Sequence, residues 1–345
     1  MRDRISAIDG LRALAVTVVV AHHLRLPGVV GGWLGVDVFF VISGYLITTQ
    51  LLEPRWTLGA FLWRRMARLW PALLVMLTAF TLLGQISWPN ALVAAAYLQT
   101  PGAMLGWGSV VVAGHCWSLA VEGQFYLLWG LFMLRARHWP RRPLVVACLL
   151  LAAVSFGARC LLMIDAAPYA AYYLPPARLD GLFLGAALAA GLPLARWSRL
   201  VAPAAVGVAV GVLTQHENTA WSQVVGMPVA IAATALTLDL VVRRPDHAVT
   251  RALAAPLLGW AGSRSYGLYL WHYPIFGVLL RLGSAWAPVK VAAAVAAAEL
   301  SYRFVEAPAR RRLNAGNPFR DRGRALGDAP AVAGGGSVVS VRLPV

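Results

Sequence analysis

Charge is what this sequence has least of. Only 13% of its 345 residues are charged, whereas 59% are hydrophobic, and the mean hydropathy is +0.67. A soluble domain carries about 25% charged residues because polar groups must cover its surface. The composition therefore excludes an ordinary soluble domain. It predicts an all-α, polytopic helical bundle whose apolar surface faces lipid.

Lysine and cysteine are also scarce. Lys290 is the only lysine, so the formal net charge of +16 comes almost wholly from arginine. The three cysteines lie outside any CxxC motif or His/Cys cluster, which argues against a metal site or a redox centre. The arginines are spread over loops between apolar segments, as membrane orientation requires, so we expect no nucleic-acid partner.

Apolar segments of the length that crosses a bilayer, roughly 20 residues, recur along the chain. We expect about ten transmembrane helices, near 8–24, 34–53, 69–87, 118–134, 143–164, 177–193, 200–214, 222–242, 264–282 and 286–306. They make up a membrane domain, 1–313, followed by a disordered tail, 314–345. Two other segments are predicted differently: 57–70 as an amphipathic helix on the membrane surface, and 91–112 as a re-entrant or surface segment.

The loops that lack charge indicate the orientation. Residues 88–116 contain no acid, lysine or arginine, whereas arginines follow the second, fourth, sixth, eighth and tenth apolar segments. Arginine on alternate loops marks the cytoplasmic side by the positive-inside rule. We therefore expect a cell-membrane protein with both termini in the cytoplasm.

The first apolar segment, "IDGLRALAVTVVVAHHL", contains ionisable residues that a lipid-facing helix would exclude. Arg12 and His23 are eleven residues apart, which places them about 20° apart around a helix and about 16 Å apart along it. Asp9 precedes Arg12 by three residues and can pair with it. One interpretation is structural: Asp9 and Arg12 lie at the interface, and His23 ends the helix. The other is a polar track that faces the bundle interior.

A second polar set lies in "HCWSLAVEGQFYLLWG", where Ser118, Glu122 and Trp129 share a helix face and Tyr126 follows one turn after Glu122. A carboxylate facing lipid is costly, so Glu122 should point inward. We predict that Glu122 lies beside His23 and orients that imidazole as a general base. A structural hydrogen bond between helices is the alternative.

Arginines are concentrated in "FLWRRMARLWPALL". Arg64, Arg65 and Arg68 are placed at the cytoplasmic end, where the guanidinium fork suits phosphate groups. Membrane orientation and attraction to anionic lipid are the alternative explanation.

Three further segments supply candidate substrate-binding residues, each of which also has a structural interpretation. In "SRSYGLYLWHYPIF", Tyr269 and His272 either line the site or belong to the aromatic core. In "PPARLDGLFLG", Arg178 and Asp180 either form an acceptor-side polar site or pair with each other at the interface. The candidate substrate-binding residues are Asp37, Tyr126, Arg178, Asp180, Tyr269 and His272.

The motifs, in their order, resemble the acyltransferase-3 family of integral membrane acyltransferases. They are "IDGLRALAV" with the later His23, "GWLGVDVFFVISGYLIT", "RRMARLWP", "WSLAVEGQFYL", "RLDGLFLG", "YGLYLWHYP" and "EAPARR", and they extend from Ile8 to Arg312. The resemblance implies transfer of an acyl group, acetyl by default, from cytoplasmic acyl-CoA to a hydroxyl group near the outer face. The acceptor would be a cell-surface glycan or glycolipid, or a macrolide-type small molecule.

The resemblance also assigns residues. The family's arginine-then-histidine motif corresponds to Arg12 and His23, and its R-x-x-R motif to Arg65 and Arg68. Its glutamate corresponds to Glu122. Members often carry a second carboxylate beside that glutamate, and this chain has Gly123 there, so Glu122 would act alone. The pantetheine arm of the donor would then follow the track from Arg12 to His23.

Two other classes of protein remain open at this point. Buried His, Glu and Arg also build the proton relays of secondary transporters, although no paired halves with interrupted helices are visible here. A non-catalytic membrane scaffold would tolerate alanine at position 23. Direct transfer and an acyl-histidine intermediate are likewise both compatible with the residues.

Overall fold

The computed structural model describes residues 2–99, 113–165, 167–217, 219–280, 283–316 and 319. Within these residues the chain is helical and contains no strand, as the composition predicts. The α-helices are α1 (Arg2–His23), α2 (Gly35–Leu51), α3 (Leu58–Leu82), α4 (Trp88–Ala95), α6 (Trp117–Ala136), α7 (Arg141–Ile164), α8 (Pro168–Tyr173), α9 (Asp180–Ala190), α10 (Val201–Thr214), α11 (Met227–Arg243), α12 (Ala248–Leu253), α13 (Pro256–Ser263), α14 (Ser265–Val278), α15 (Ala287–Ser301) and α16 (Ala307–Ala315).

Short 3-10 and π segments join or extend these helices. The 3-10 turns are η1 (Gly32–Leu34), η2 (Gly114–Cys116), η3 (Pro175–Ala177), η4 (Ala195–Leu200) and η7 (Ser284–Trp286). The π segments η5 (Ser222–Gly226) and η8 (Tyr302–Glu306) lie directly before α11 and between α15 and α16.

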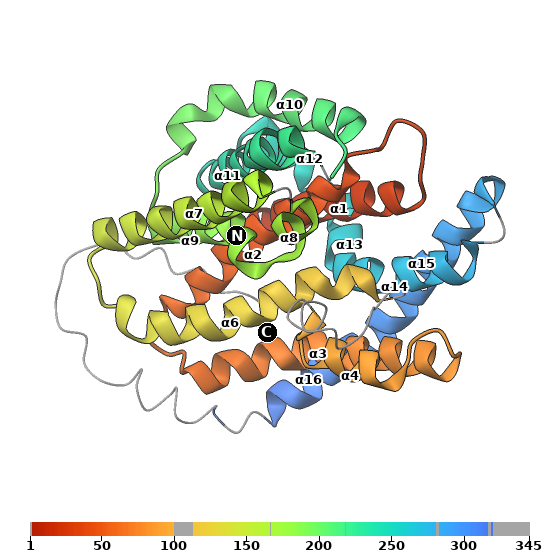
Figure 1. Cartoon of the computed structure of the whole chain (residues 1–345). Coiled ribbons are helices and arrows are strands. Elements are labelled where there is room, and N and C mark those ends of the chain that lie inside the picture. The colour runs from red at the N-terminus through yellow and green to blue at the C-terminus, as the bar shows by residue number, and fades with distance from the viewer. Residues whose placement is uncertain are drawn as a thin grey trace.

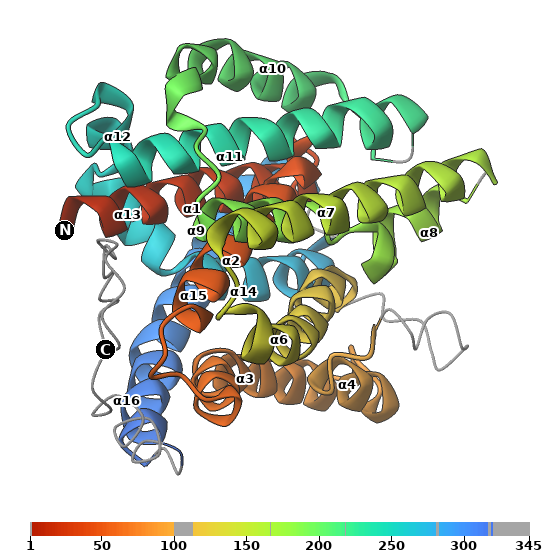
Figure 2. The ribbon, with the colours of Figure 1, turned by 90° about the vertical axis from the view of Figure 1, so that its left-hand side faces the viewer.

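The helices lie in layers (Figures 1 and 2). In both views α10 and α11 lie on one side of α1, α7 and α9, and α3 and α16 lie on the other. In Figure 2 the N-terminus is at one side of the molecule, and α8 is at the opposite side together with the adjoining end of α7. Helix α1 starts at the N-terminal side in this view. Arg12 lies near its middle, and His23 is its last residue.

Five helical segments among the described residues are long and apolar enough to cross a membrane. They are Gly32–Leu51, Leu58–Leu82, Arg141–Ile164, Ala195–Thr214 and Ser222–Arg243. The predicted count of about ten spans is therefore not confirmed. The segment predicted at 177–193, for example, contains an α-helix of only 11 residues, α9. At ~1.5 Å per residue this helix is about 17 Å long, which is shorter than the hydrocarbon core.

The structure corrects the prediction for the arginine-rich segment. A surface helix over 57–70 and a separate span over 69–87 were expected, but α3 is one continuous helix. It begins at Thr57, whose hydroxyl accepts a hydrogen bond from the Ala60 N–H at 3.2 Å. It then continues through Pro71, a residue that apolar membrane helices tolerate when neighbouring helices support them. The arginines therefore lie on a helix that packs against the bundle.

Two other predictions fall mainly on residues outside the described part of the chain. The segment 91–112 begins inside α4, and residues 100–112 lie outside the described residues. Of the tail 314–345, only Asn314, Ala315, Gly316 and Phe319 are described, the first two as the end of α16.

Glycines let the central helices approach closely. A Cβ atom at Gly44 in α2 would lie 1.9 Å from the Leu182 carbonyl oxygen of α9, and one at Gly185 would lie 2.1 Å from the Val41 oxygen. Backbones come this near only where a side chain is absent, as in small-residue contacts between membrane helices. The contact fixes α2 against α9, and so sets the positions of the polar residues that α2 carries.

Candidate active site

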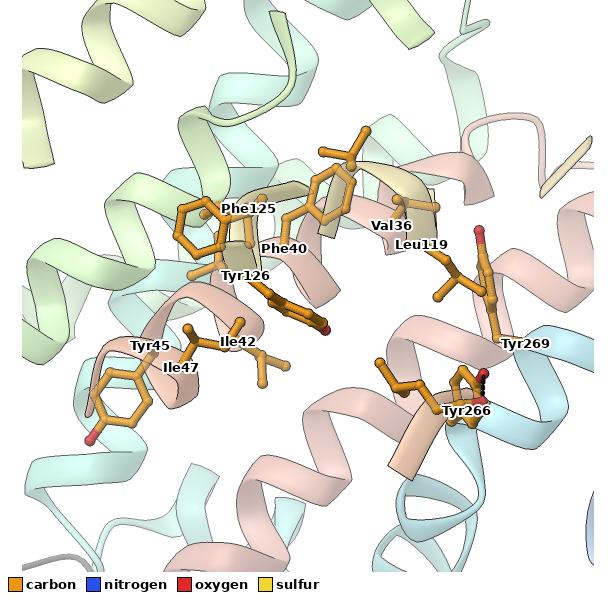
Figure 3. Packing of buried hydrophobic residues seen from close by; sticks show 14 of the residues in the cluster. Val36, Phe40, Ile42, Tyr45, Ile47, Leu119, Phe125, Tyr126, Tyr266 and Tyr269 are labelled. Carbon is orange, nitrogen blue, oxygen red and sulfur yellow. Dashed lines mark hydrogen bonds between the residues drawn. The ribbon is translucent and has the colours of Figure 1, made fainter. Parts of the chain in front are cut away.

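A cavity opens between α1, α2, α3, α6 and α14. The empty space between its lining residues amounts to about 720 Å³, a volume that includes solvent at its open mouth. Figure 3 shows Tyr126 from α6 on one side of this space, and Tyr266 and Tyr269 from α14 on the other. Its polar lining consists of Arg12, Ser43, Arg65, Arg68, Ser118, Glu122, Tyr126, Ser265, Tyr266 and Tyr269.

Three of the predicted arginines line the cavity. Arg12 pairs with Asp9 at 2.9 Å, as the i,i+3 spacing predicts. The Nη2 atom of Arg65 donates to Gln50 Oε1 at 3.0 Å, and its guanidinium lies 5.7 Å from the centre of the Tyr126 ring. The Arg65 Nε atom is buried and has no hydrogen-bond partner in the described structure. With Arg68 beside them, these groups give the cavity an excess of positive charge and one free donor, Arg65 Nε, which suits an anionic ligand.

Arg64 lies apart from this group. Its guanidinium lies over the Trp56 ring, 5.3 Å from the ring centre. Arg64 is not among the described residues that line the cavity, whereas Arg65 and Arg68 are. Of the three arginines predicted as one cluster, Arg65 and Arg68 therefore line the cavity, and Arg64 packs on Trp56 instead.

Glu122 lies inside the cavity, but the predicted contact with His23 is wrong. Ser43 donates to Glu122 Oε1 at 2.6 Å, and Tyr126 donates to Oε2 at 2.7 Å. The described structure contains no hydrogen bond or ion pair between Glu122 and His23. The carboxylate instead interacts electrostatically with Arg12 and Arg65. The reason is that this face of α6 packs toward α2 and α3, which brings Glu122 to the arginines.

The glycine beside Glu122, where relatives often carry a second carboxylate, packs closely against Tyr97. A Cβ atom at Gly123 would lie 2.9 Å from the Tyr97 ring. The amide of the next residue, Gln124, donates to the Tyr97 carbonyl oxygen at 3.2 Å. Tyr97 thus fills the space that a larger side chain at position 123 would need.

His23 contacts another histidine. Its Nδ1 atom lies 2.9 Å from the Val19 carbonyl oxygen and 3.2 Å from His272 Nε2. The Nδ1 atom of His272 lies 2.9 Å from the Leu268 carbonyl oxygen. The sequence pointed to both histidines but not to their contact.

These contacts assign the tautomers of the two neutral rings. A carbonyl oxygen only accepts, so the Leu268 oxygen requires the proton of His272 on Nδ1, which leaves His272 Nε2 as an acceptor. The Val19 oxygen and His272 Nε2 then both require the proton of His23 on Nδ1. His23 Nε2 is consequently the nitrogen with an available lone pair.

A third histidine completes what we call the histidine cluster: His23, His115 and His272. His115 Nε2 lies 3.1 Å from the Leu270 carbonyl oxygen, and its ring stacks on Tyr273 with the centres 4.8 Å apart. The Tyr273 ring is also 4.9 Å from His23. Sequence analysis did not assign His115 and Tyr273 to the site, although both lie within the quoted motifs. Among the described residues, no group of three or more His, Cys, Asp or Glu side chains is arranged to hold a metal ion.

Tyr269 separates the cavity from the histidine cluster. Its hydroxyl donates to the His115 carbonyl oxygen at 2.8 Å and lies 2.8 Å from the Ser118 hydroxyl. Its ring is 5.8 Å from the His272 ring. Tyr269 lines the cavity, whereas His23 and His272 are not among the described lining residues. The described lining of the cavity thus ends at Tyr269 on the side of the histidine cluster, and the continuous track from Arg12 to His23 stays a prediction.

Arg178 and Asp180, predicted either to form an acceptor site or to pair with each other, have other partners. Arg178 lies 3.0 Å from Asp37, and both side chains are buried. The rings of Phe40, Trp117 and Tyr172 surround its guanidinium, with centres 5.6, 5.3 and 5.0 Å away. Asp37 and Arg178 therefore form an enclosed ion pair between α2 and the start of α9.

Asp180 pairs with Arg159, which sequence analysis missed. The two side chains make a bidentate contact of 3.1 and 2.6 Å, and Arg159 also donates to the Ala177 carbonyl oxygen at 2.9 Å. A signal was present, because an arginine inside the apolar segment 143–164 needs a buried partner. Arg178 and Asp180 are two residues apart and do not face each other on a helix, so each pairs with a different element.

Fold and site together define a helical integral membrane protein in which an arginine-lined cavity lies beside a histidine cluster. A family model described as an acyltransferase domain matches residues 5–299, nearly the whole chain. The chain belongs to this family, the acyltransferase-3 family of integral membrane acyltransferases. No solved structure matches it.

Three curated relatives resemble the chain along most of its length. It is 32% identical to peptidoglycan O-acetyltransferase OatA of Listeria monocytogenes, over 93% of this chain and 58% of the relative. It is 31% identical to putative peptidoglycan O-acetyltransferase YrhL of Bacillus subtilis, over 89% and 55%. It is 30% identical to O-acetyltransferase OatA of Staphylococcus aureus, over 88% and 57%. The chain thus spans little more than half the length of these relatives.

Proposed function

We propose that the chain is a membrane O-acyltransferase that moves an acyl group, acetyl first of all, from cytoplasmic acyl-CoA to a hydroxyl group of a cell-surface glycan or glycolipid. The observation that carries this proposal is the imidazole of His23, whose Nδ1 is held while its Nε2 is available, next to an arginine-lined cavity. The curated relatives support it, since they are named as peptidoglycan O-acetyltransferases.

The cavity is the proposed donor site. Arg12, Arg65 and Arg68 would bind the phosphates of coenzyme A, because guanidinium groups make charge-assisted, often bidentate hydrogen bonds to phosphate. Phe39 and Leu46 would line the thinner pantetheine arm. The thioester would then arrive at Tyr269, so a rotation of that side chain is needed to join the donor site to His23.

Glu122 acts in this proposal at the donor site. Its carboxylate compensates the charges of Arg12 and Arg65 and fixes the hydroxyls of Ser43 and Tyr126. It is therefore a positioning residue for the donor site, and it makes no described hydrogen bond to His23.

His23 is the proposed general base. Its Nε2 atom takes the proton of the acceptor hydroxyl while that oxygen attacks the thioester carbonyl carbon. The new C–O bond forms, the C–S bond breaks, and the proton passes from Nε2 to the leaving thiolate of coenzyme A. His272 holds the ring in the tautomer that this step requires.

Localisation follows from the same proposal. A cytoplasmic donor requires the arginine end of the cavity to face the cytoplasm, which agrees with arginine on alternate loops. Both termini would then lie in the cytoplasm, and the histidine cluster would lie nearer the outer surface. Reporter fusions at Arg137 and at Asp165 check this, since the loop after α6 should report as cytoplasmic and the loop after α7 as external.

The decisive experiment is acyl transfer by purified protein in detergent or nanodiscs with labelled acetyl-CoA. We expect wild-type protein to form an ester on a glycan acceptor, and His23→Ala and His23→Gln to lose turnover while keeping the elution profile of the folded protein. Flux across vesicles without any ester would favour the transporter. A product formed only on a macrolide would favour the small-molecule alternative.

A further inference from the structure

Two tyrosines and one carboxylate near the histidine cluster are not among the described residues that line the donor cavity. Tyr169 and Tyr173 lie one turn apart on α8, and their rings are parallel within 5° with centres 6.4 Å apart. The Tyr169 side chain is 64% exposed, while Tyr173 is half-buried against Trp117, 5.3 Å between ring centres. We call these two residues the tyrosine platform.

A carboxylate, Glu217, interacts with one residue of the platform. Glu217 Oε2 is 3.9 Å from His22 Nε2, and both side chains are partly exposed. The same carboxylate interacts electrostatically with the phenols of Tyr173 and Tyr273. Glu217 thus links Tyr173 to the surroundings of His23, because the ring of His22 is 5.2 Å from that of His23, and Tyr273 contacts His23 directly.

Buried polar contacts hold this surface in place. The amide of Gln223, which is fully buried, donates to the carbonyl oxygens of Pro168 at 3.0 Å and Glu217 at 2.9 Å. One side chain thus ties the start of α8 to the segment that bears Glu217. The Trp33 indole donates to the Gln215 carbonyl oxygen at 3.2 Å, which fixes the other side of that segment.

A simpler explanation is the aromatic belt that membrane proteins place at the lipid–water interface. The belt accounts for exposed tyrosines as such. It does not require a carboxylate that interacts with Tyr173, Tyr273 and His22, or a buried glutamine that joins the two segments. These contacts make the surface a built site beside the proposed base.

We propose that the tyrosine platform, Glu217 and His22 form the acceptor subsite and bind one sugar ring of the glycan. The C–H face of a pyranose ring carries partial positive charge and packs on the negative face of an aromatic ring. A carboxylate accepts hydrogen bonds from sugar hydroxyls. With its ring on the platform and its hydroxyls on Glu217, a sugar would direct a neighbouring hydroxyl to Nε2 of His23. The assignment rests on the proposed function.

The test uses full-length protein in nanodiscs, labelled acetyl-CoA and, as acceptor, a soluble tetrasaccharide of β-1,4-linked N-acetylglucosamine. We expect Tyr169→Ala/Tyr173→Ala to raise the KM for the tetrasaccharide roughly tenfold, which corresponds to about 1.4 kcal/mol. The KM for acetyl-CoA should stay within about twofold, since the donor cavity is separate. Glu217→Gln should raise the acceptor KM several-fold, and Tyr169→Phe/Tyr173→Phe should restore the wild-type value because the rings remain.

Phe304→Ala is the matched control, an exposed aromatic residue in η8 that is 72% exposed. It should leave both KM values unchanged. Saturation-transfer NMR with the tetrasaccharide alone measures binding without turnover, and the double alanine variant should lose this signal.

The outcomes separate the two proposals. If wild-type protein acetylates the tetrasaccharide and the alanine variants keep its KM and NMR signal, the acceptor subsite is wrong. If wild-type protein turns over acetyl-CoA with another acceptor but neither binds nor acetylates the tetrasaccharide, the sugar assignment is wrong. If wild-type protein neither binds nor turns over acetyl-CoA, the proposed function itself fails.

Discussion

The Nε2 atom of His272 lies 3.2 Å from the Nδ1 atom of His23, and the Leu268 carbonyl oxygen holds the other nitrogen of His272 at 2.9 Å. This relay from a backbone carbonyl through one imidazole to the next sets the tautomer of His23. In the proposed mechanism it takes the place that a carboxylate usually holds beside a catalytic histidine. The pair joins α14 to the end of α1, two helices that are far apart in the sequence.

The first prediction concerns His272. In His272→Ala only the Val19 carbonyl oxygen remains to hold His23 Nδ1, so the ring is oriented less firmly. We expect kcat to fall by roughly 10–100-fold, less than the roughly 10²–10⁴-fold that general acid–base catalysis contributes, because the base itself remains. The KM for acetyl-CoA should not change. His272→Gln should recover part of the rate, since its amide oxygen can accept the Nδ1 proton of His23. Steady-state kinetics with both substrates check this, and equal losses in the two variants would contradict the positioning role.

A second prediction separates the arginines of α3. Arg65→Ala and Arg68→Ala each remove a charged donor from the cavity, and a hydrogen bond to a charged group contributes about 1.5–3 kcal/mol. We expect each change to weaken CoA binding by roughly ten- to a hundredfold, measured by calorimetry in nanodiscs. Arg64→Ala is the control and should change the affinity by less than about threefold, because Arg64 lies over Trp56 outside the cavity. A comparable loss in all three variants would favour general attraction of charge.

Glu122 provides a third prediction. Glu122→Gln keeps hydrogen-bonding capacity toward Ser43 and Tyr126 but removes the charge that compensates Arg12 and Arg65. We expect a several-fold change in the KM for acetyl-CoA and no change in the pH dependence of turnover. Turnover rates of wild-type protein and Glu122→Gln, measured from pH 5 to 9, test whether the pH dependence changes. A shifted pH profile would restore the sequence-based hypothesis that Glu122 acts on His23.

Tyr269 is expected to control the passage between the donor cavity and the histidine cluster. In Tyr269→Ala the aromatic ring between the cavity and the histidine cluster is lost, and water reaches the thioester. Hydrolysis of acetyl-CoA without acceptor should therefore rise several-fold, while transfer to the acceptor falls. Tyr269→Phe keeps the ring but loses its hydrogen bonds to His115 and Ser118, and should give an intermediate effect. Release of free CoA, followed with a thiol reagent, measures the leak; an unchanged rate in the alanine variant would refute the closure.

The fifth prediction tests the contact between α2 and α9. In Gly44→Ala the new methyl group would lie 1.9 Å from the Leu182 oxygen, so the helices must separate, and we expect a loss of about 1–3 kcal/mol in the free energy of unfolding. Gly157→Ala in α7 is the control, because a Cβ atom there meets nothing within 4 Å. Thermal unfolding in detergent should show a lower Tm only for the first variant. An unchanged Tm in Gly44→Ala would contradict the prediction, because it would show that α2 and α9 can separate without loss of stability.

The amino-acid sequence by itself determined the class of protein and the residues that matter within single helices. Low charge and long apolar segments required membrane helices, and five such helices are found. The pairing of Arg12 with Asp9 was predictable because both lie on one helix, three residues apart. The order of the motifs was sufficient to identify the family, whose model matches residues 5–299.

The tertiary structure decided every contact between helices. Glu122 pairs with Ser43, Asp37 with Arg178, and His23 with His272, and none of these partners follows from spacing in the sequence. Helical periodicity gives the direction of a side chain around its own axis, but the helix that packs opposite depends on close contacts such as the one at Gly44. For that reason the sequence supplied the ionisable groups of the site, and only the packing of the helices divided them between an arginine cavity and a histidine cluster.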